Sequence, residues 1–203
     1  MTAWRSGSLS KQAIVVVDVQ NDFVDGSLGT PRGVDVARGI HSFLGDAIAE
    51  SEADTHVIGT LDWHIDPQGH FSKDPDYVNT WPVHCVADTH GARVCSELGE
   101  DLVHAWFKKG EYTAAYSGFE GHLDGGEETL EQWLRAREVE ELTVVGIATD
   151  YCVKATVLDA LEAGFEVTVI ERLCSAVKED TGKEALREME EAGATIVHTS
   201  QPV

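Results

Sequence analysis

The sequence lacks any apolar run long enough to cross a membrane, which takes roughly 20 residues as a helix. Its first apolar run, Ala13 to Val17, is followed at once by Asp18 and is also too short for a secretory signal peptide. We therefore expect no membrane segment and no membrane partner.

Basic residues are also scarce. The chain has 15 lysines and arginines against 36 acidic residues, which gives a formal net charge of −21. A phosphate backbone or an anionic membrane surface would be repelled by this charge, so we expect no nucleic acid as a partner. Most of the acidic excess is explained as a solvated surface, and it says little about the substrate.

Cysteine is sparse and without CxxC spacing. The four cysteines are Cys85, Cys95, Cys152 and Cys174. Their scatter favours free thiols in a reducing, cytoplasmic environment over a disulfide framework.

Neither an internal repeat nor a linker divides the chain. With 203 residues, of which 42% are hydrophobic, it is large enough to bury one continuous core. Residues 1–12 are polar and contain Gly and Ser, so we expect a flexible N-terminal lead-in followed by a single domain over residues 13–203.

Apolar runs alternate with segments of helical periodicity along the chain. This alternation predicts an α/β protein with a mostly parallel, six-stranded sheet that is covered on both faces. The expected strands are 13–19, 55–61, 102–107, 142–145, 165–170 and 195–198. The expected helices are 36–48, 129–137, 153–161 and 181–192.

The stretch from Gly146 to Val153 runs from a strand into a helix and carries a candidate nucleophile. Cys152 falls in the predicted first turn, with Asp150 or Thr149 as the N-cap. Backbone N–H groups and the helix dipole favour an anion there, so we expect a depressed pKa for this thiol and an oxyanion site beside it. The alternative is a buried cysteine that only fills space.

Two further reactive groups follow strands that should end at the same edge of the sheet. Asp18 ends the first strand and could act as a general base for Cys152, or could merely cap the following loop. Lys109 follows the third strand and would keep a carboxylate ionised, with Lys108 as the competing candidate.

A cluster of metal-ligand residue types lies within 23 positions. Asp62 and His64 are spaced i, i+2, so both side chains of an extended segment point to one face and Trp63 points to the other. Together with His70 and His84 they would suit one divalent ion such as zinc, iron or manganese. The alternative is that some of them are ordinary loop histidines.

Six motifs in this order resemble the nicotinamidase branch of the isochorismatase-like cysteine hydrolases, over residues 13–199. They are Asp18 to Phe23, Asp62 to Pro67, Trp81 to Cys85, Lys109-Gly110, Tyr116 to Gly121 and Gly146 to Val153. Any one of these motifs is weak, whereas their joint occurrence is specific. The resemblance implies a three-layer α/β/α fold and a catalytic triad of Asp18, Lys109 and Cys152.

The same resemblance implies the remaining parts of the site. The metal ligands would be Asp62, His64, His70 and His84, and the backbone N–H groups of Ala148 and Cys152 would form the oxyanion hole after a cis peptide bond that precedes Ala148. The walls around a flat heteroaromatic ring would be Phe23, Trp81 and Tyr116, and Ile147 would also bind the substrate. Tyr151 departs from the pattern, because close members of the family have histidine there.

The implied reaction is hydrolysis of nicotinamide, and of pyrazinamide, to the acid and ammonia through a cysteine thioester, a step of NAD salvage. An alternative is another hydrolase of the family that acts on a different small amide, such as a carbamoyl amide, or on an isochorismatase-type ether. A metal-binding or interaction protein without catalysis is a third. Both a monomer and a homodimer are compatible with the sequence.

Overall fold

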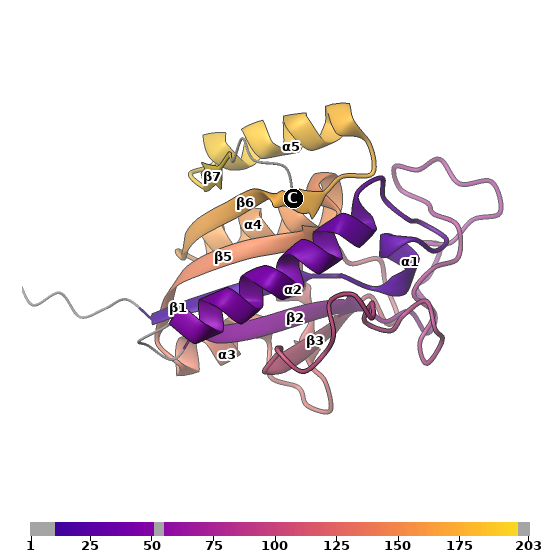
Figure 1. The fold of residues 1–203 in the computed structure, drawn as a ribbon. Helices are drawn as coiled ribbons and strands as arrows, with labels where there is room; N and C mark the ends of the chain where they lie inside the picture. The colour runs from indigo at the N-terminus through magenta and orange to yellow at the C-terminus, as the bar shows by residue number, and fades with distance from the viewer. Residues whose placement is uncertain (1–10, 51–54, 199–203) are drawn as a thin grey trace, which may run out of the picture.

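The computed structural model describes residues 11–50 and 55–198, whose strands join one sheet in the order β4-β3-β2-β1-β5-β6-β7 (Figure 1). All neighbouring strands are parallel except β3 and β4. The strands are β1 Lys11–Val17, β2 His56–Asp62, β3 Ala105–Lys109, β4 His122–Leu123, β5 Val139–Ile147, β6 Glu166–Ser175 and β7 Thr195–Val197.

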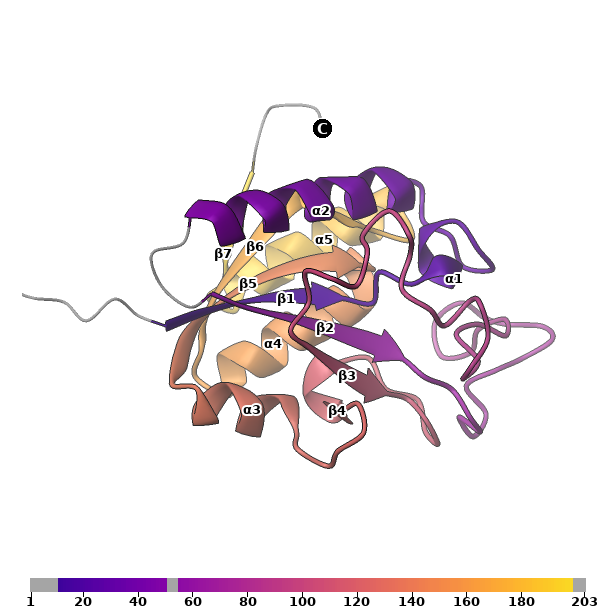
Figure 2. The same cartoon turned by 60° about the horizontal axis from the view of Figure 1, so that its bottom comes forward.

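Helices cover both faces of this sheet, as Figure 2 shows. They are α1 Asn21–Val24, α2 Gly33–Glu50, α3 Leu130–Ala136, α4 Lys154–Glu162 and α5 Glu179–Glu191. Apolar residues of α2 pack on one face, and those of α3, α4 and α5 belong to the cluster on the other. The predicted three-layer α/β/α arrangement is therefore confirmed. In the part of the chain that the structure describes, no helix is both long and apolar enough to span a membrane.

The sheet has seven strands, so the predicted count of six is wrong by one. The missed strand is β4, which pairs antiparallel with the end of β3. Two residues are too few to show an alternating pattern, which is why the sequence does not predict it. Of the expected lead-in, residues 1–10 lie outside the described residues, whereas Lys11 and Gln12 already belong to β1.

Strand β1 lies at the centre of the sheet and is buried on both faces. Val15 and Val17 belong to the core on the α3 and α4 side, and Ile14 and Val16 belong to the core under α2. Because side chains alternate along a strand, an uninterrupted apolar run places valines and isoleucines in both cores.

The contact between β1 and β5 requires a glycine near the end of β5. Gly146 is paired with Val17 and has a φ of +129°, a conformation that residues with a side chain rarely adopt. A Cβ atom at this position would lie 2.2 Å from the carbonyl oxygen of Val17. The close approach of the two strands thus depends on the absence of a side chain.

We expect Gly146→Ala to lower the free energy of unfolding by more than about 3 kcal/mol, because positive φ and a backbone clash add. Gly193→Ala is the matched control, since Gly193 has a φ of +115° but nothing within 4 Å of its Cβ position. Denaturant unfolding of both variants separates the clash from the conformational cost. Equal losses in the two variants would contradict the clash.

Candidate active site

The carboxyl ends of four adjacent parallel strands form the floor of the candidate site. The strands lie in the order β3, β2, β1, β5, and Asp62 at the end of β2 is in register with Lys109 at the end of β3. Asp18 follows β1 directly, and the segment after β5 leads to Cys152. Neighbouring strands lie about 4.8 Å apart, so these ends bring side chains from distant parts of the sequence within reach of one another.

The ammonium group of Lys109 lies at the centre of this floor and is fully buried. Its Nζ atom lies 2.9 Å from Asp18 Oδ2 and 3.6 Å from Cys152 Sγ, and it also forms a short ion pair with Asp62 Oδ1. Burial alone would lower the pKa of Lys109, but the two carboxylates outweigh burial and raise it well above its usual value. The two carboxylates therefore favour the charged form of Lys109.

Lys108, the competing lysine, faces away from the site. Its Nζ atom pairs with Asp124 Oδ1 at 2.7 Å and lies 3.9 Å above the ring of Trp63. Alternation along β3 sends successive side chains to opposite faces, so only one of the two lysines can reach the carboxylates.

Asp18 is held by a residue that sequence reasoning missed. The hydroxyl of Thr60 donates a hydrogen bond of 2.6 Å to Asp18 Oδ1, and the carboxylate is completely buried. Burial and the charge of Asp62 raise the pKa of Asp18, against the opposing effect of Lys109 and Thr60. A raised pKa makes this carboxylate a better proton acceptor than an aspartate in water.

Cys152 lies beside Asp18, with its sulfur within 4.8 Å of a carboxylate oxygen, and its side chain is buried. Burial raises its pKa well above the usual value, Lys109 opposes that rise, and the negative charge of Asp18 adds to it. The predicted depression of this pKa is therefore wrong, because the sequence argument counted the helix start and not the loss of solvent. A base is needed to form the thiolate.

The backbone around Cys152 also differs from the predicted helix start. Thr149–Val153 form a single π-helical turn ahead of α4, and no side chain caps it. Asp150 instead accepts hydrogen bonds from the backbone N–H groups of Val177 and Lys178 and from the Thr181 hydroxyl. Its carboxylate thus ties this turn to the start of α5.

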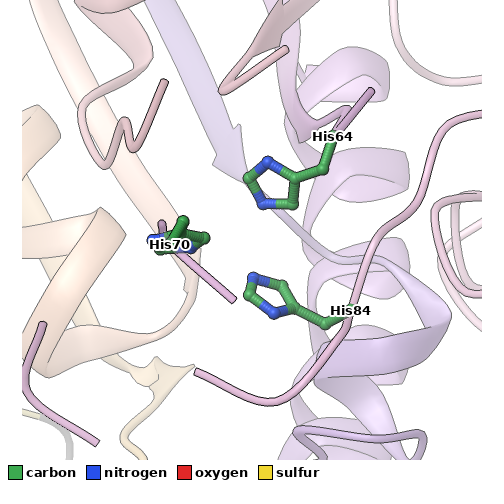
Figure 3. A group of neighbouring side chains, drawn as sticks. All are labelled: His64, His70 and His84. Atoms are coloured by element: carbon green, nitrogen blue, oxygen red, sulfur yellow. The ribbon is translucent and has the colours of Figure 1, made fainter. Parts of the chain in front are cut away.

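Three histidines converge beside the floor, and Figure 3 shows their rings facing one another. His64, His70 and His84 each offer a ring nitrogen within 4.8 Å of the others. Asp62 Oδ2 lies 3.5 Å from His64 Nε2 and 3.9 Å from His84 Nε2. His70 returns to this point through a tight turn in which its N–H bonds to the carbonyl of Pro67 at 3.1 Å.

The hydrogen bonds around these rings fit a metal ion. His64 Nδ1 lies 2.6 Å from the carbonyl of Gly110 and His84 Nδ1 lies 2.8 Å from that of Pro82, so each Nε2 is left with a lone pair. His64 Nε2 and His70 Nδ1 are buried without a hydrogen-bond partner. Burial and the neighbouring histidines lower the pKa of His70 to about 4, which keeps it in the neutral form that binds metals.

A cavity of about 280 Å³ opens above both groups and is lined mainly by aromatic and apolar side chains. Phe23, Trp81 and Tyr116 line it, as the resemblance implies, together with Ala148, and the Ile147–Ala148 peptide bond is cis, which confirms that expectation. Ile147 does not line it, because its side chain is completely buried in the core under α2. The candidate metal ligands Asp62, His70 and His84 and the candidate nucleophile Cys152 also line the cavity.

Gln20 is a second residue that sequence reasoning missed. Its side-chain amide donates to the carbonyls of Asp62 and Ala92 at 2.8 Å each and accepts from the Asp62 N–H at 2.9 Å. Gln20 therefore fixes the backbone of a candidate ligand. A polar residue in the short segment that follows the buried strand β1, after Asp18 and Val19, is the only signal the sequence gives for this role.

A model of the isochorismatase domain matches residues 12–201 of the chain. The nicotinamidase/pyrazinamidase of Mycobacterium tuberculosis is 46% identical over 190 residues, which cover 93% of this chain and 100% of that protein.

Two solved structures are also similar. The pyrazinamidase of Pyrococcus horikoshii in complex with zinc has a TM-score of 0.77 and 34% identity, covering 93% of this chain and 99% of that one. PnC1 of L. infantum in complex with nicotinate has a TM-score of 0.77 and 28% identity, covering 96% of each chain. The expected resemblance is thereby confirmed.

We expect His70→Ala to weaken Zn²⁺ binding by at least about 10- to 100-fold, the range found when only an outer-shell partner of a metal ligand is lost. His90→Ala is the control, because His90 is an exposed loop histidine outside the cluster. Competition with a chromophoric chelator gives the affinity of each variant. Unchanged affinity in His70→Ala would show that His70 is not a ligand.

Proposed function

The chain belongs to the isochorismatase domain family, and we propose that it is an amidohydrolase that converts nicotinamide, and also pyrazinamide, to the carboxylate and ammonia. Its similarity to nicotinamidases along nearly its whole length supports this substrate class. Nicotinate formed in this way would enter NAD salvage.

One observation carries the proposal. A buried ammonium, Lys109, touches a buried carboxylate, Asp18, and a buried thiol, Cys152, at the base of an aromatic-lined cavity. A base paired with a nucleophile beneath a pocket for a flat ring suits acyl transfer from an aromatic amide.

The first half of the reaction forms a thioester. Asp18 accepts the proton of Cys152, and Lys109 stabilises the resulting thiolate across 3.6 Å. The sulfur attacks the amide carbon, and the backbone N–H groups of Ala148 and Cys152 stabilise the oxyanion. The tetrahedral intermediate collapses when Asp18 returns the proton to the departing nitrogen, which leaves as ammonia.

The second half hydrolyses the thioester. Asp18, again a carboxylate, takes a proton from a water molecule, whose oxygen attacks the acyl carbon. The C–S bond then breaks, Asp18 returns the proton to the sulfur of Cys152, and the product leaves as nicotinate after its acid proton is lost to solvent. Asp62, His64, His70 and His84 would hold one divalent ion, zinc, iron or manganese. When bound, such an ion supplies Lewis-acid stabilisation and a position for the ring nitrogen of the substrate. Phe23, Trp81 and Tyr116 would hold the ring between aromatic surfaces.

The proposed function is tested by ammonia release from nicotinamide, followed with purified protein and with the Cys152→Ala variant. We expect the wild type to produce equimolar ammonia and nicotinate, and the variant to lose activity by at least about 10⁴-fold because its nucleophile is gone. Metal content of Cys152→Ala should be unchanged.

Cys174→Ala is the matched control, because Cys174 is buried like Cys152 but lies on β6 outside the cavity. It should keep wild-type turnover. Turnover of Cys152→Ala within tenfold of the wild type would overturn the proposed role of this thiol, and absence of ammonia with the wild type would overturn the substrate.

Thr60→Val tests whether Asp18 needs its hydroxyl partner. The substitution keeps the shape of the side chain but removes a hydrogen bond to a buried carboxylate, so we expect kcat/KM to fall by about tenfold or more. Thr143→Val is the control, since Thr143 lies on β5 opposite Ile14, before the strand ends that carry the site. Equal kinetics for the two variants would contradict a role for Thr60 in orienting Asp18.

A further inference from the structure

Residues 73–80, which we name the tip loop, project from a base that belongs to the site. At this base the backbone N–H of Ser72 donates to the carbonyl of Trp81 at 2.8 Å, and the N–H of Trp81 donates to the carbonyl of His70 at 2.9 Å. The loop thus begins and ends at a candidate metal ligand and an aromatic wall of the cavity.

The tip loop is folded internally by one carboxylate. Asp76 accepts hydrogen bonds from the backbone N–H groups of Val78, Asn79 and Thr80 at 2.8 to 2.9 Å. These bonds hold the pKa of Asp76 well below its usual value. The loop is therefore a preformed unit that is held by its own hydrogen bonds.

Only one hydrogen bond ties this unit to the rest of residues 11–50 and 55–198 beyond its base. The hydroxyl of Tyr151 donates to the backbone carbonyl of Tyr77 at 3.1 Å. Tyr77 is 48% exposed, and both tyrosines line the cavity. Tyr151 directly precedes Cys152, so this bond joins the loop to the turn that carries the proposed nucleophile.

The ring of Tyr151 is fixed in place by contacts with two other aromatic rings. It meets Trp81 edge-on at a centroid distance of 4.9 Å and lies nearly parallel to Tyr116 at 6.1 Å. The indole N–H of Trp81 donates to the Tyr116 hydroxyl at 3.0 Å, which fixes these two rings to each other. The phenol oxygen of Tyr151 is thus positioned by two walls of the cavity.

We propose that Tyr151 is a positioning residue that latches the tip loop over the mouth of the cavity and thereby sets how tightly an aromatic amide is held. Its hydroxyl contacts the loop rather than the reacting groups, so loss of the latch affects retention of the substrate and leaves the acyl-transfer step unchanged. This inference rests on the proposed function for its kinetic consequence only.

Tyr151→Phe tests the latch, because it removes one oxygen atom and keeps the ring between its neighbours. Chymotrypsin should cleave the Tyr77–Val78 bond about three- to tenfold faster in this variant, because the carbonyl of that bond accepts the hydrogen bond that is lost. The free energy of one neutral hydrogen bond corresponds to a factor of about this size in the population of the open loop. The KM for nicotinamide should rise by a similar factor, with kcat within about twofold of the wild type.

The control is Tyr112→Phe, which removes the same atom from a tyrosine that is 59% exposed and does not line the cavity. It should match the wild type in cleavage rate, KM and kcat. Thermal unfolding of both variants verifies that any change is local.

Equal cleavage of Tyr151→Phe and the wild type after Tyr77 would overturn the latch, and so would a fall in kcat at constant KM, which would assign Tyr151 to the chemistry. Because cleavage is measured without substrate, it decides the latch even if nicotinamide proves not to be the substrate. In that case the proposed function is wrong, and the cleavage rate alone tests whether Tyr151 holds the tip loop.

Discussion

The site depends on one buried cation. The ammonium of Lys109 has lost all contact with solvent, and it is tolerated because Asp18 and Asp62 supply two carboxylates in direct contact. Removing one partner from such a buried group typically costs about 3–5 kcal/mol, because the remaining charges are left uncompensated. Asp62 also faces the histidine cluster through its second oxygen, so the same ion pair joins the proposed catalytic group to the proposed metal ligands.

The sheet delivers this arrangement through parallel pairing in a fixed register. Asp62 and Lys109 are register partners across β2 and β3, and Asp18 follows the neighbouring strand β1. Gly146 allows β5 to approach β1 closely enough to complete the edge, and Gln20 fixes the backbone of Asp62. A shift of one residue in the register of β1, β2 or β3 would send Asp18, Asp62 or Lys109 to the opposite face of the sheet.

The residues of the site come partly from strand ends and partly from the segments between strands. Asp18, Asp62 and Lys109 lie at or directly after strand ends, where neighbouring backbones hold them. The histidines His70 and His84 and the aromatic walls come from the segments between strands. Loops tolerate changes in sequence that buried strands do not, so the choice of substrate can vary while the chemistry is kept. The bond from Tyr151 to Tyr77 and the ring contacts of Tyr151 with Trp81 and Tyr116 join the turn that carries Cys152 to the aromatic walls.

The sequence by itself determined the α/β class, the layers and the set of residues that gather at the sheet edge, because buried parallel strands are continuous apolar runs whose polar ends are visible in the chain. The residue pattern left Lys108 as a competitor of Lys109, and only the resemblance favoured Lys109, because the alternation along β3 does not say which of its two faces carries the carboxylates of Asp18 and Asp62. The resemblance also placed Ile147 among the substrate-binding residues, whereas its side chain lies in the core. Only the tertiary structure decided the pKa of Cys152, since the loss of solvent around a thiol comes from segments far away in the sequence and outweighs the local effect of a helix start.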